Sequence, residues 1–232
     1  NEIKETEKFY KLKEKKLVQY GYGRLDTLLK EKEIFQKTEL NPKLILITPS
    51  YGKNNLLEIC GIEIIEFLLQ SNFKVVLRPH FKILRDSDDL INLIENKFGK
   101  NPNFILEKGV IPTNLFHNSI CLISDWSGIS FEYAFTFERP VIFIDVPKKI
   151  LNPNSNNLTN QPIEISLRNQ IGHVISPNNL ESITDILNKI EDNDLFSKKI
   201  QEIRSQTVYN VGESAKIGTN YIVKLLDDND ST

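Results

Sequence analysis

Short, almost continuously apolar runs recur along the chain and are separated by segments whose apolar residues follow helical spacing. The runs cover residues 43–48, 74–77, 103–106, 119–124 and 140–144. Runs of this kind are typical of strands buried on both faces, as in parallel sheets that are covered by helices. The alternation predicts an α/β fold with a Rossmann-like, doubly wound parallel sheet.

Apolar residues at helical spacing predict the helices between and after these strands. The predicted helices cover residues 54–69, 87–98, 125–137, 180–190, 194–207 and 213–226, with a brief turn over 113–117. Residues 145–170 are rich in Asn and Pro, carry no periodicity and are predicted to form a long loop. We expect three parts: an N-terminal helix and linker (1–42), the Rossmann-like domain (43–226) and a frayed tail (227–232).

Composition and motif searches disfavour several functional classes. The chain has 29 Lys and Arg against 31 Asp and Glu, a formal net charge of −2, which argues against bulk attraction to nucleic acid. Cys60 and Cys121 are too few for a disulfide framework or a four-thiolate zinc site, and both lie in apolar surroundings typical of core residues in a reducing compartment. The sequence contains no Walker loop, GxGxxG, HExxH or GxSxG motif and no metal-ligand spacing.

The chain shows no sign of membrane insertion or secretion. No run approaches the ~18–20 apolar residues that span a bilayer, and the charged N-terminus lacks a signal-peptide core. Lys11, Lys13, Lys15 and Lys16 are interleaved with Glu, which indicates a solvated face. We therefore expect a cytoplasmic protein. Because the chain contains no Met, we also expect it to be a fragment or processed product of something larger.

The strongest candidate site follows the strand at 119–124. Ligands of open parallel sheets bind outside the carboxyl ends of the strands. Here Ser127 is a favourable N-cap and Gly128 opens a helix, whose first N–H groups and dipole favour an anion. Ser127 and Ser130 add hydroxyl donors, so an organic phosphate fits there. An ordinary capped helix would use the same residues.

Two carboxylates accompany this helix start. Glu132 lies in an otherwise apolar helix that is predicted to be buried, so its carboxylate needs a partner. Ribose hydroxyls one turn from a phosphate site are a natural partner, and a structural contact to an Arg or to backbone is the alternative. Asp125 is acidic beside the predicted anion site, so we expect it to fix the loop through hydrogen bonds.

The loops after the first two strands supply further candidates. His80 follows a strand and Pro79 and is predicted to face the cleft. An imidazole, whose ordinary pKa is near ~6.5, can donate a proton or a hydrogen bond to a phosphate. Arg78 is assigned to the same phosphate site, although strand alternation points it away from His80. Pro49 and Ser50, after the first strand, are assigned to a nucleotide ribose or base.

His117 and His173 have no comparable setting, and both are predicted to be structural or exposed.

Four separated segments carry a family resemblance. They are GYGRLD (21–26), VVLRPHF (75–81), SICLISDWSGISFEYAFTFERPVIFID (119–145) and NVGESAKIGTNYIVKLL (210–226). The third matches a strand, an (S/T)DYSS-like turn, an apolar helix and a (K/R)P strand, with Trp126 for the usual Tyr and Gly128 for the second Ser. Together they resemble the CDP-glycerol glycerophosphotransferase family of teichoic-acid and capsule polymer synthesis over residues 20–226, with Gly23 replacing a Pro of the first element.

The resemblance implies a GT-B fold of two Rossmann-like halves, of which this chain is the C-terminal, donor-binding half. It implies transfer of glycerol or ribitol phosphate from a CDP-activated donor to a cell-surface polymer, without a cofactor or metal. By matching position, His80 would assist at the donor phosphates. Ser127, Gly128 and Ser130 would hold the pyrophosphate, and Glu132 would lie near the ribose.

The resemblance also implies an acceptor that would bind outside this chain. The acceptor, lipid-linked or a polysaccharide, would bind through an N-terminal half that carries a second His. A lipid-linked acceptor would place the enzyme at the inner face of the bacterial membrane. We therefore expect donor binding and little turnover from this chain alone.

Two other functions fit the same residues. Gly128 and Glu132 also suit other GT-B nucleotide-sugar enzymes, including glycosyltransferases and UDP-sugar 2-epimerases. A non-catalytic nucleotide-binding domain in a cell-surface assembly complex is the second alternative, since the expected lack of an N-terminal half fits it.

Overall fold

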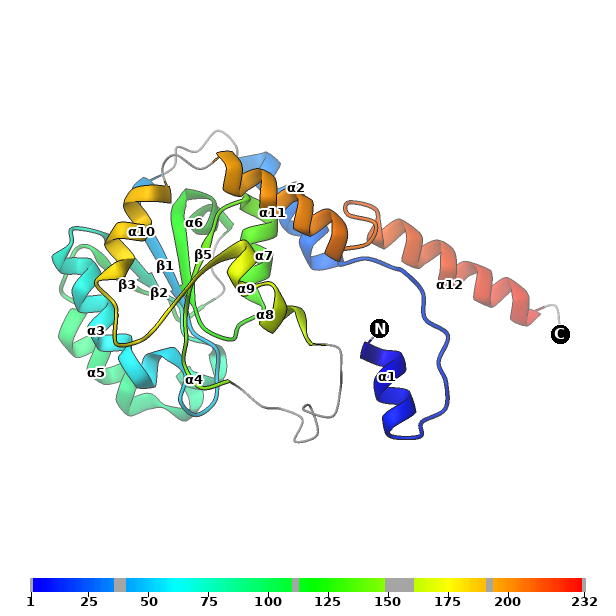
Figure 1. Ribbon diagram of the computed structural model, residues 1–232, viewed down its shortest axis with the longest axis horizontal. Coiled ribbons are helices and arrows are strands. Elements are labelled where there is room, and N and C mark those ends of the chain that lie inside the picture. Colours follow the sequence, from blue (N-terminus) through cyan, green and yellow to red (C-terminus); the bar gives the residue numbers. More distant parts are fainter. Residues whose placement is uncertain (1, 36–40, 110–112, 149–160, 191–193, 231–232) are drawn as a thin grey trace.

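The computed structural model describes residues 2–35, 41–109, 113–148, 161–190 and 194–230. A six-stranded sheet forms the centre of the fold (Figure 1). Its strands are β1 (Asn41–Thr48), β2 (Lys74–Leu77), β3 (Phe104–Leu106), β4 (Ser119–Ser124), β5 (Val141–Ile144) and β6 (Gly172–Ile175). The first five are the predicted apolar runs.

Every strand pairing is parallel, and the strand order is β3-β2-β1-β4-β5-β6. This confirms the predicted Rossmann-like, doubly wound sheet. The order reverses between β1 and β4, and in such sheets the crevice at the reversal is where ligands bind. The residues that follow Thr48 and Ser124 therefore lie at the expected binding position.

Helices cover both faces of the sheet (Figure 1). The helices of the described residues are α1 (Glu2–Phe9), α2 (Gly23–Phe35), α3 (Leu56–Gln70), α4 (Phe81–Asp86), α5 (Asp88–Phe98), α6 (Thr113–Asn118), α7 (Ile129–Phe137), α8 (Ile163–Ser166), α9 (Arg168–Ile171), α10 (Ser182–Ile190), α11 (Asp194–Thr207) and α12 (Ser214–Asp230). Helix α7 begins four residues later than predicted. Helix α12 continues to its last described residue, so the tail predicted to fray from 227 begins as helix.

The region predicted to be one loop over 145–170 contains structure. Its residues 149–160 lie outside the described part of the chain, and α8 and α9 follow. Strand β6 was not predicted, because its sequence GHVI opens with a Gly and a His. At Gly172 an added Cβ would lie 2.0 Å from the Val141 carbonyl oxygen. Close pairing of β6 with β5 therefore requires glycine at this position.

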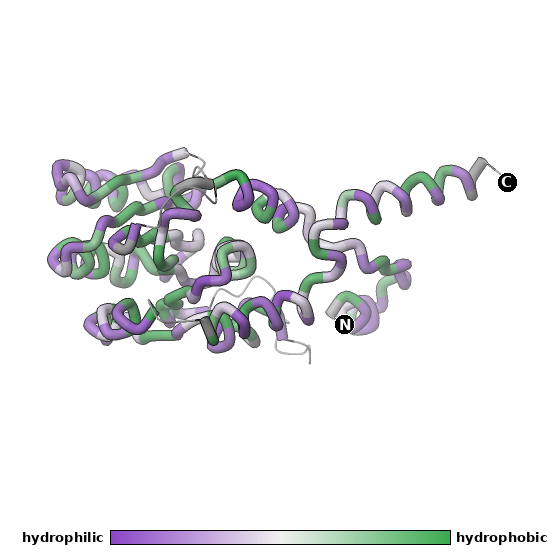
Figure 2. The backbone as a smooth tube through the Cα atoms, turned by 90° about the horizontal axis from the view of Figure 1, so that it is seen from above, coloured by the Kyte–Doolittle hydropathy of each residue, from purple (hydrophilic) through white to green (hydrophobic). Residues whose placement is uncertain are grey.

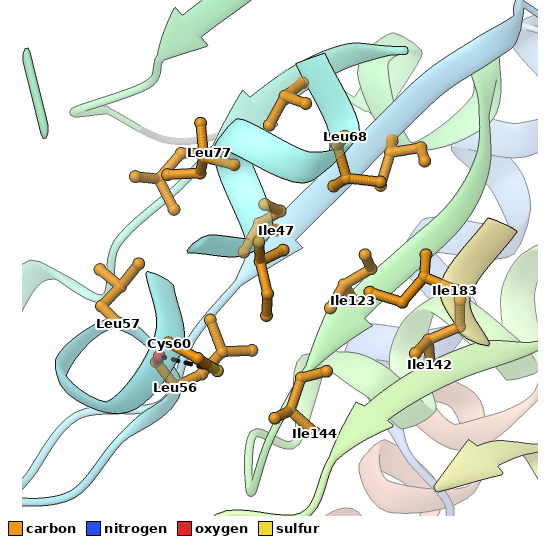
Figure 3. Packing of buried hydrophobic residues seen from close by; sticks show 14 of the residues in the cluster. Ile47, Leu56, Leu57, Cys60, Leu68, Leu77, Ile123, Ile142, Ile144 and Ile183 are labelled. Carbon is orange, nitrogen blue, oxygen red and sulfur yellow. Dashed lines mark hydrogen bonds between the residues drawn. The ribbon is translucent and has the colours of Figure 1, made fainter. Parts of the chain in front are cut away.

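Two hydrophobic clusters lie on opposite faces of the sheet. Ile45 and Ile47 of β1 belong to the cluster under α3, α5 and α10, whereas Leu44 and Leu46 belong to the cluster under α2, α7 and α11. Figure 3 shows part of the first cluster, where Ile47, Ile123 and Ile142 come from three neighbouring strands. Successive strand residues point to opposite faces, which explains why the runs are apolar throughout.

Helix α2 belongs to the folded unit. It packs against α7, and Leu25 is completely buried in the second cluster. The domain boundary predicted at residue 42 is therefore too late, because this stretch adds a helix to the sheet face rather than a linker.

The two terminal helices extend from this core (Figure 1). Helix α12 projects away from the sheet, and hydrophobic and hydrophilic residues alternate along it (Figure 2). Ile222, Val223 and Leu226 are exposed on it. Within the described ranges, no helix has both the length and the apolar character needed to cross a bilayer.

Candidate functional site

A cavity of about 440 Å³ lies at the sheet edge where the strand order reverses. Loops after β1, β2, β3 and β4 all contribute to it, because parallel strands end on the same edge. Its wall includes Thr48, Pro49, Arg78, Pro79, His80, Lys108, Gly109, Ser127 and Ile129. We call it the switch-point cavity. It brings together Pro49, Arg78, His80 and Ser127 from three of the predicted clusters.

His80 is held rigidly in this wall. It is the N-cap of α4, and its Nδ1 accepts a hydrogen bond of 3.2 Å from the Lys82 backbone N–H. The ring lies between those of Tyr51 and Phe81, with centroid separations of 4.6 and 4.5 Å. Because Nδ1 is an acceptor here, the neutral ring carries its proton on Nε2. His80 can therefore present an N–H donor to an anion.

Arg78 lies on the same wall as His80. Strand alternation was expected to separate the two, but β2 ends at Leu77, so the alternation does not extend to Arg78. Burial lowers the pKa of Arg78, and the charge of Arg24 lowers it further, while Glu132 and Glu107 oppose both effects. A guanidinium stays protonated at neutral pH, so Arg78 brings a positive charge to the cavity.

Thr48 is a wall residue to which the sequence assigned no role. Its side chain is buried, and its Oγ1 has no hydrogen-bond partner among the described residues. A buried hydroxyl without a partner is uncommon in folded proteins, but this oxygen is itself buried, so other atoms of Thr48 form its part of the cavity wall. The signal available in the sequence was its position as the last residue of β1. Ser50, which was assigned to the nucleotide, is buried and absent from the described wall.

Asp125 joins the loops after β1 and β4. Its Oδ1 accepts hydrogen bonds from the backbone N–H groups of Ser50 and Trp126, both at 2.7 Å, and its Oδ2 accepts one from Leu56 at 2.9 Å. The residue is 1% exposed. In this geometry the carboxylate fixes both loops, and Asp125 is absent from the described cavity walls.

Trp126 and Arg168 secure the other side of the β4 loop. The Trp126 indole donates to the Val146 carbonyl at 3.0 Å, and the Arg168 guanidinium lies 3.9 Å from the Trp126 ring centroid. The start of α7 is thus held from both sides.

The start of α7 differs from the predicted cap. Gly128, not Ser127, occupies the N-cap position, with helical φ and ψ and no side-chain cap bond. The Ser130 N–H donates to the Ser127 carbonyl, and the Phe131 and Glu132 N–H groups donate to the Gly128 carbonyl. No described residue accepts a hydrogen bond from the N–H groups of Gly128 and Ile129. These two N–H groups lie at the helix N-terminus, which is the positive end of the helix dipole.

The Ser130 hydroxyl, expected to bind phosphate, is instead closed off. The residue is completely buried, its Oγ has no described partner, and it is absent from the described cavity walls. In this conformation the hydroxyl cannot reach a ligand.

Glu132 faces a second cavity, of about 310 Å³, on the other side of the α7 start. Its Oε1 accepts a 2.5 Å hydrogen bond from the Tyr22 hydroxyl, and its Oε2 lies 3.8 Å from Arg24 Nε. Burial and this bond raise the pKa of Tyr22 to about 12. The structure therefore divides the predicted site: Ser127 lines the switch-point cavity, and Gly128 and Glu132 line the second. The ribose contact of Glu132 stays a prediction.

Two segments far apart in the sequence meet beside this second cavity. The buried Asp26 carboxylate accepts hydrogen bonds from the N–H groups of Gly212 (2.6 Å) and Ser214 (3.0 Å) and from the Ser214 hydroxyl. Gly21, at φ +122°, approaches so closely that an added Cβ would lie 2.6 Å from Ser214 Cβ. The first and last resembling motifs thus form one unit, which we call the Asp26 clamp (residues 19–26 with 209–214).

The Asp26 clamp makes stability depend on pH. Burial alone would raise the pKa of Asp26, but the hydrogen bonds from Ser214 and Gly212 outweigh it and lower the pKa. A lowered pKa stabilises the fold above the unfolded value near ~4, and this stability is lost as pH falls through the folded pKa. We expect Asp26→Asn to cost about 2 kcal/mol at pH 7, because an amide N–H₂ would face N–H donors.

Urea denaturation at pH 7 and pH 3 measures this effect. The deficit of the Asp26→Asn variant should shrink at pH 3, because Asp26 of the unfolded chain, with a pKa near ~4, is mostly protonated there and the stability that its lowered folded pKa provides is being lost. Asp185→Asn, at an exposed site on α10, is the matched control and should change little. An equal deficit at both pH values would contradict the prediction.

No group of three His, Cys, Asp or Glu side chains within the described ranges is arranged to hold a metal ion. His117 and His173 are absent from the described lining of both cavities. Cys60 and Cys121 are buried free thiols whose pKa burial raises to about 12.

Comparisons with known proteins agree with this architecture. A sequence model of the CDP-Glycerol:Poly(glycerophosphate) glycerophosphotransferase family matches residues 2–149. Among solved structures, the wall teichoic acid polymerase TagF, in a variant soaked with CDPG, aligns with a TM-score of 0.56 and 20% identity over 95% of this chain and 53% of its own. A second TagF structure aligns with a TM-score of 0.52 and 20% identity over 91% of this chain and 53% of its own.

The UDP-GlcNAc 2-epimerase of Methanocaldococcus jannaschii, in complex with UDP-GlcNAc and UDP, has the same fold. It aligns with a TM-score of 0.56 and 14% identity over 97% of this chain and 58% of its own. The chain thus spans about half the length of these structures. A search of curated proteins found no match.

Proposed function

Because this chain belongs to the CDP-glycerol:poly(glycerophosphate) glycerophosphotransferase family, we propose that it forms the donor-binding half of a polymer-synthesising transferase. Its donor is a CDP-activated polyol, glycerol or ribitol phosphate, and its acceptor is a cell-surface polymer bound outside this half. Such acceptors are lipid-linked or polysaccharides, so the enzyme would work at the inner face of the membrane.

The observation that carries this proposal is the switch-point cavity. Its wall combines the Arg78 guanidinium and the His80 imidazole with the start of α7. A cation, N–H donors and a helix N-terminus together favour a phosphate. Its volume of about 440 Å³ lies within the range of small-molecule sites.

We assign the donor diphosphate to Ser127 and to the amides of Gly128 and Ile129, with Arg78 and His80 facing it. Pro49 lies on the wall beside the nucleoside. Glu132, one turn into α7, would take a hydroxyl-bearing group attached to the diphosphate. Asp125 holds the loops in place.

The proposed reaction moves one phosphoryl group. An acceptor hydroxyl attacks the β-phosphorus of the CDP-polyol, the bond from that phosphorus to the bridging oxygen breaks, and CMP leaves. The acceptor's proton passes to a base. Arg78, the His80 Nε2–H and the α7 amides stabilise the charge that builds on the phosphate oxygens, so this half of the enzyme works through positioning and electrostatics.

Calorimetric titration with cytidine and uridine nucleotides tests the proposal. We expect CDP and CDP-glycerol to bind at least about tenfold more tightly than UDP and UDP-GlcNAc, since one lost hydrogen bond to a base edge has about that effect. Arg78→Gln, which removes the cation and keeps most of the side-chain length, should weaken CDP binding. No binding of CDP would refute the proposal.

The same titration addresses the nearest alternative. The epimerase has the same fold and was solved with UDP-GlcNAc and UDP. A preference of this chain for uridine nucleotides would therefore indicate a nucleotide-sugar enzyme. CDP binding without turnover by the protein that carries this chain would indicate the non-catalytic alternative.

A further inference from the structure

Tyr22 makes the one hydrogen bond that connects the Asp26 clamp to the start of α7 among the described residues. Its hydroxyl donates to Glu132 Oε1 at 2.5 Å across 110 positions of sequence. With a pKa of about 12, the phenol keeps its proton at neutral pH and remains a donor. The Glu132 carboxylate is therefore held on one oxygen by a partner that cannot ionise under working conditions.

The second carboxylate oxygen keeps acceptor capacity. Its nearest described cation, Arg24 Nε, lies 3.8 Å away, beyond hydrogen-bond distance. An ionised carboxylate can accept about four hydrogen bonds, so Glu132 can accept from a ligand while it stays bound to Tyr22. Arg24 is half exposed, and without Tyr22 the Glu132 carboxylate could turn to pair with it.

The space beside this pair suits a small hydroxyl-bearing group. The second cavity measures about 310 Å³, and its wall combines the Tyr22 ring and Phe131 with two carboxylates, Glu132 and Glu164. Apolar surface with a few hydrogen-bond acceptors is typical of small-molecule sites. The carboxylates disfavour a phosphate and favour O–H donors. The cavity adjoins Gly128, whose amide belongs to the proposed phosphate site.

We propose that Tyr22 is a positioning residue of the donor site, holding Glu132 so that its free oxygen accepts from vicinal hydroxyls attached to the diphosphate. The second cavity receives this diol, which comes from the ribose or from the polyol of the donor. This inference rests on the proposed function. It extends the donor site to residues 21–26, which the hydrogen bonds of Asp26 hold in place.

The test compares ligands that differ in one diol. CDP, 2′-deoxy-CDP and CDP-glycerol are titrated into the wild-type chain and its Tyr22→Phe and Glu132→Gln variants. For the wild-type chain we expect one of two differences of about tenfold, the effect of losing one hydrogen bond to a charged group. Either 2′-deoxy-CDP binds more weakly than CDP, or CDP binds more weakly than CDP-glycerol. The first result identifies the ribose as the source of the diol, and the second identifies the polyol.

Tyr22→Phe should abolish most of that preference while leaving affinity for the ligand without the diol nearly unchanged. A merely structural role would lower affinity for every ligand equally. Glu132→Gln should have the same effect, and the double variant should lose no more than either single variant, because both act on one contact. Tyr20→Phe is the matched control, since Tyr20 lies two residues earlier in the same segment and is absent from the described wall of both cavities.

The outcomes distinguish a failure of this inference from a failure of the proposed function. If wild type binds CDP but neither diol matters, or if Tyr22→Phe keeps the full preference, this inference is wrong and the proposed function stands. If CDP does not bind at all, both are wrong. Circular dichroism and urea denaturation of each variant confirm that the comparison is between folded proteins.

Discussion

Replacing His80 by alanine should lower the rate of polyol-phosphate transfer about 10²–10³-fold, the usual effect of losing a preorganised donor to a charged transition state. The Lys82 N–H holds Nδ1, and Tyr51 and Phe81 hold the ring, so Nε2 is placed in advance. The rate is measured with CDP-glycerol on the protein that carries this chain. Affinity for CDP should fall less than the rate, because the contact strengthens as charge develops.

Two further variants sharpen this result. His80→Gln places an amide N–H near the position of Nε2 and should recover part of the rate. His173→Ala is the matched control, because His173 lies on β6 at the far edge of the sheet, against Phe196. Turnover of His80→Ala near the wild-type level would remove His80 from the site.

Asp125→Ala should give the largest loss of stability among these variants. The carboxylate is 1% exposed and accepts hydrogen bonds from three backbone N–H groups, those of Ser50, Trp126 and the first residue of α3, Leu56, and all three would lose their partner. Each buried group left unsatisfied costs on the order of 1–3 kcal/mol, so we expect a loss of about 3 kcal/mol or more in the free energy of unfolding. Urea denaturation at neutral pH measures it.

The same change should also weaken CDP binding, because the loops after β1 and β4 form two walls of the switch-point cavity. Asp89→Ala, at an exposed position in the first turn of α5, is the control and should cost less than about 1 kcal/mol. A cost at Asp125 no larger than at Asp89 would show that the two loops are held by other contacts.

The strands were predictable because their signal is local. Residues 44–47 and 120–123 are apolar throughout, and short runs of this kind are typical of strands covered on both faces. Strand β6 escaped prediction because Gly172 and His173 fill half of its four positions, and its formation depends on close pairing with β5. Helix α2 was not predicted, because its apolar face can be identified only from its packing against α7 in the folded structure.

The site was predictable in part for the same reason. Once the sheet is parallel, residues directly after its strands must share an edge, which brings Arg78, His80 and Ser127 to one cavity. The orientation of single side chains was not predictable. Whether a serine such as Ser130 faces a ligand or the core depends on where α7 begins, and that differs by a few residues from the predicted start.

By itself the sequence determined the parallel α/β class, the sheet edge at which the cavity lies and the positively charged and N–H-donating residues at that edge. All three follow from periodicity and residue chemistry over a few neighbouring positions. Only the tertiary structure decided that Glu132 belongs with Tyr22 in a second cavity, and that Asp26 ties residues 19–26 to 209–214. Contacts across 110 or more positions depend on how two surfaces fit once the core has packed, and no local pattern encodes that fit.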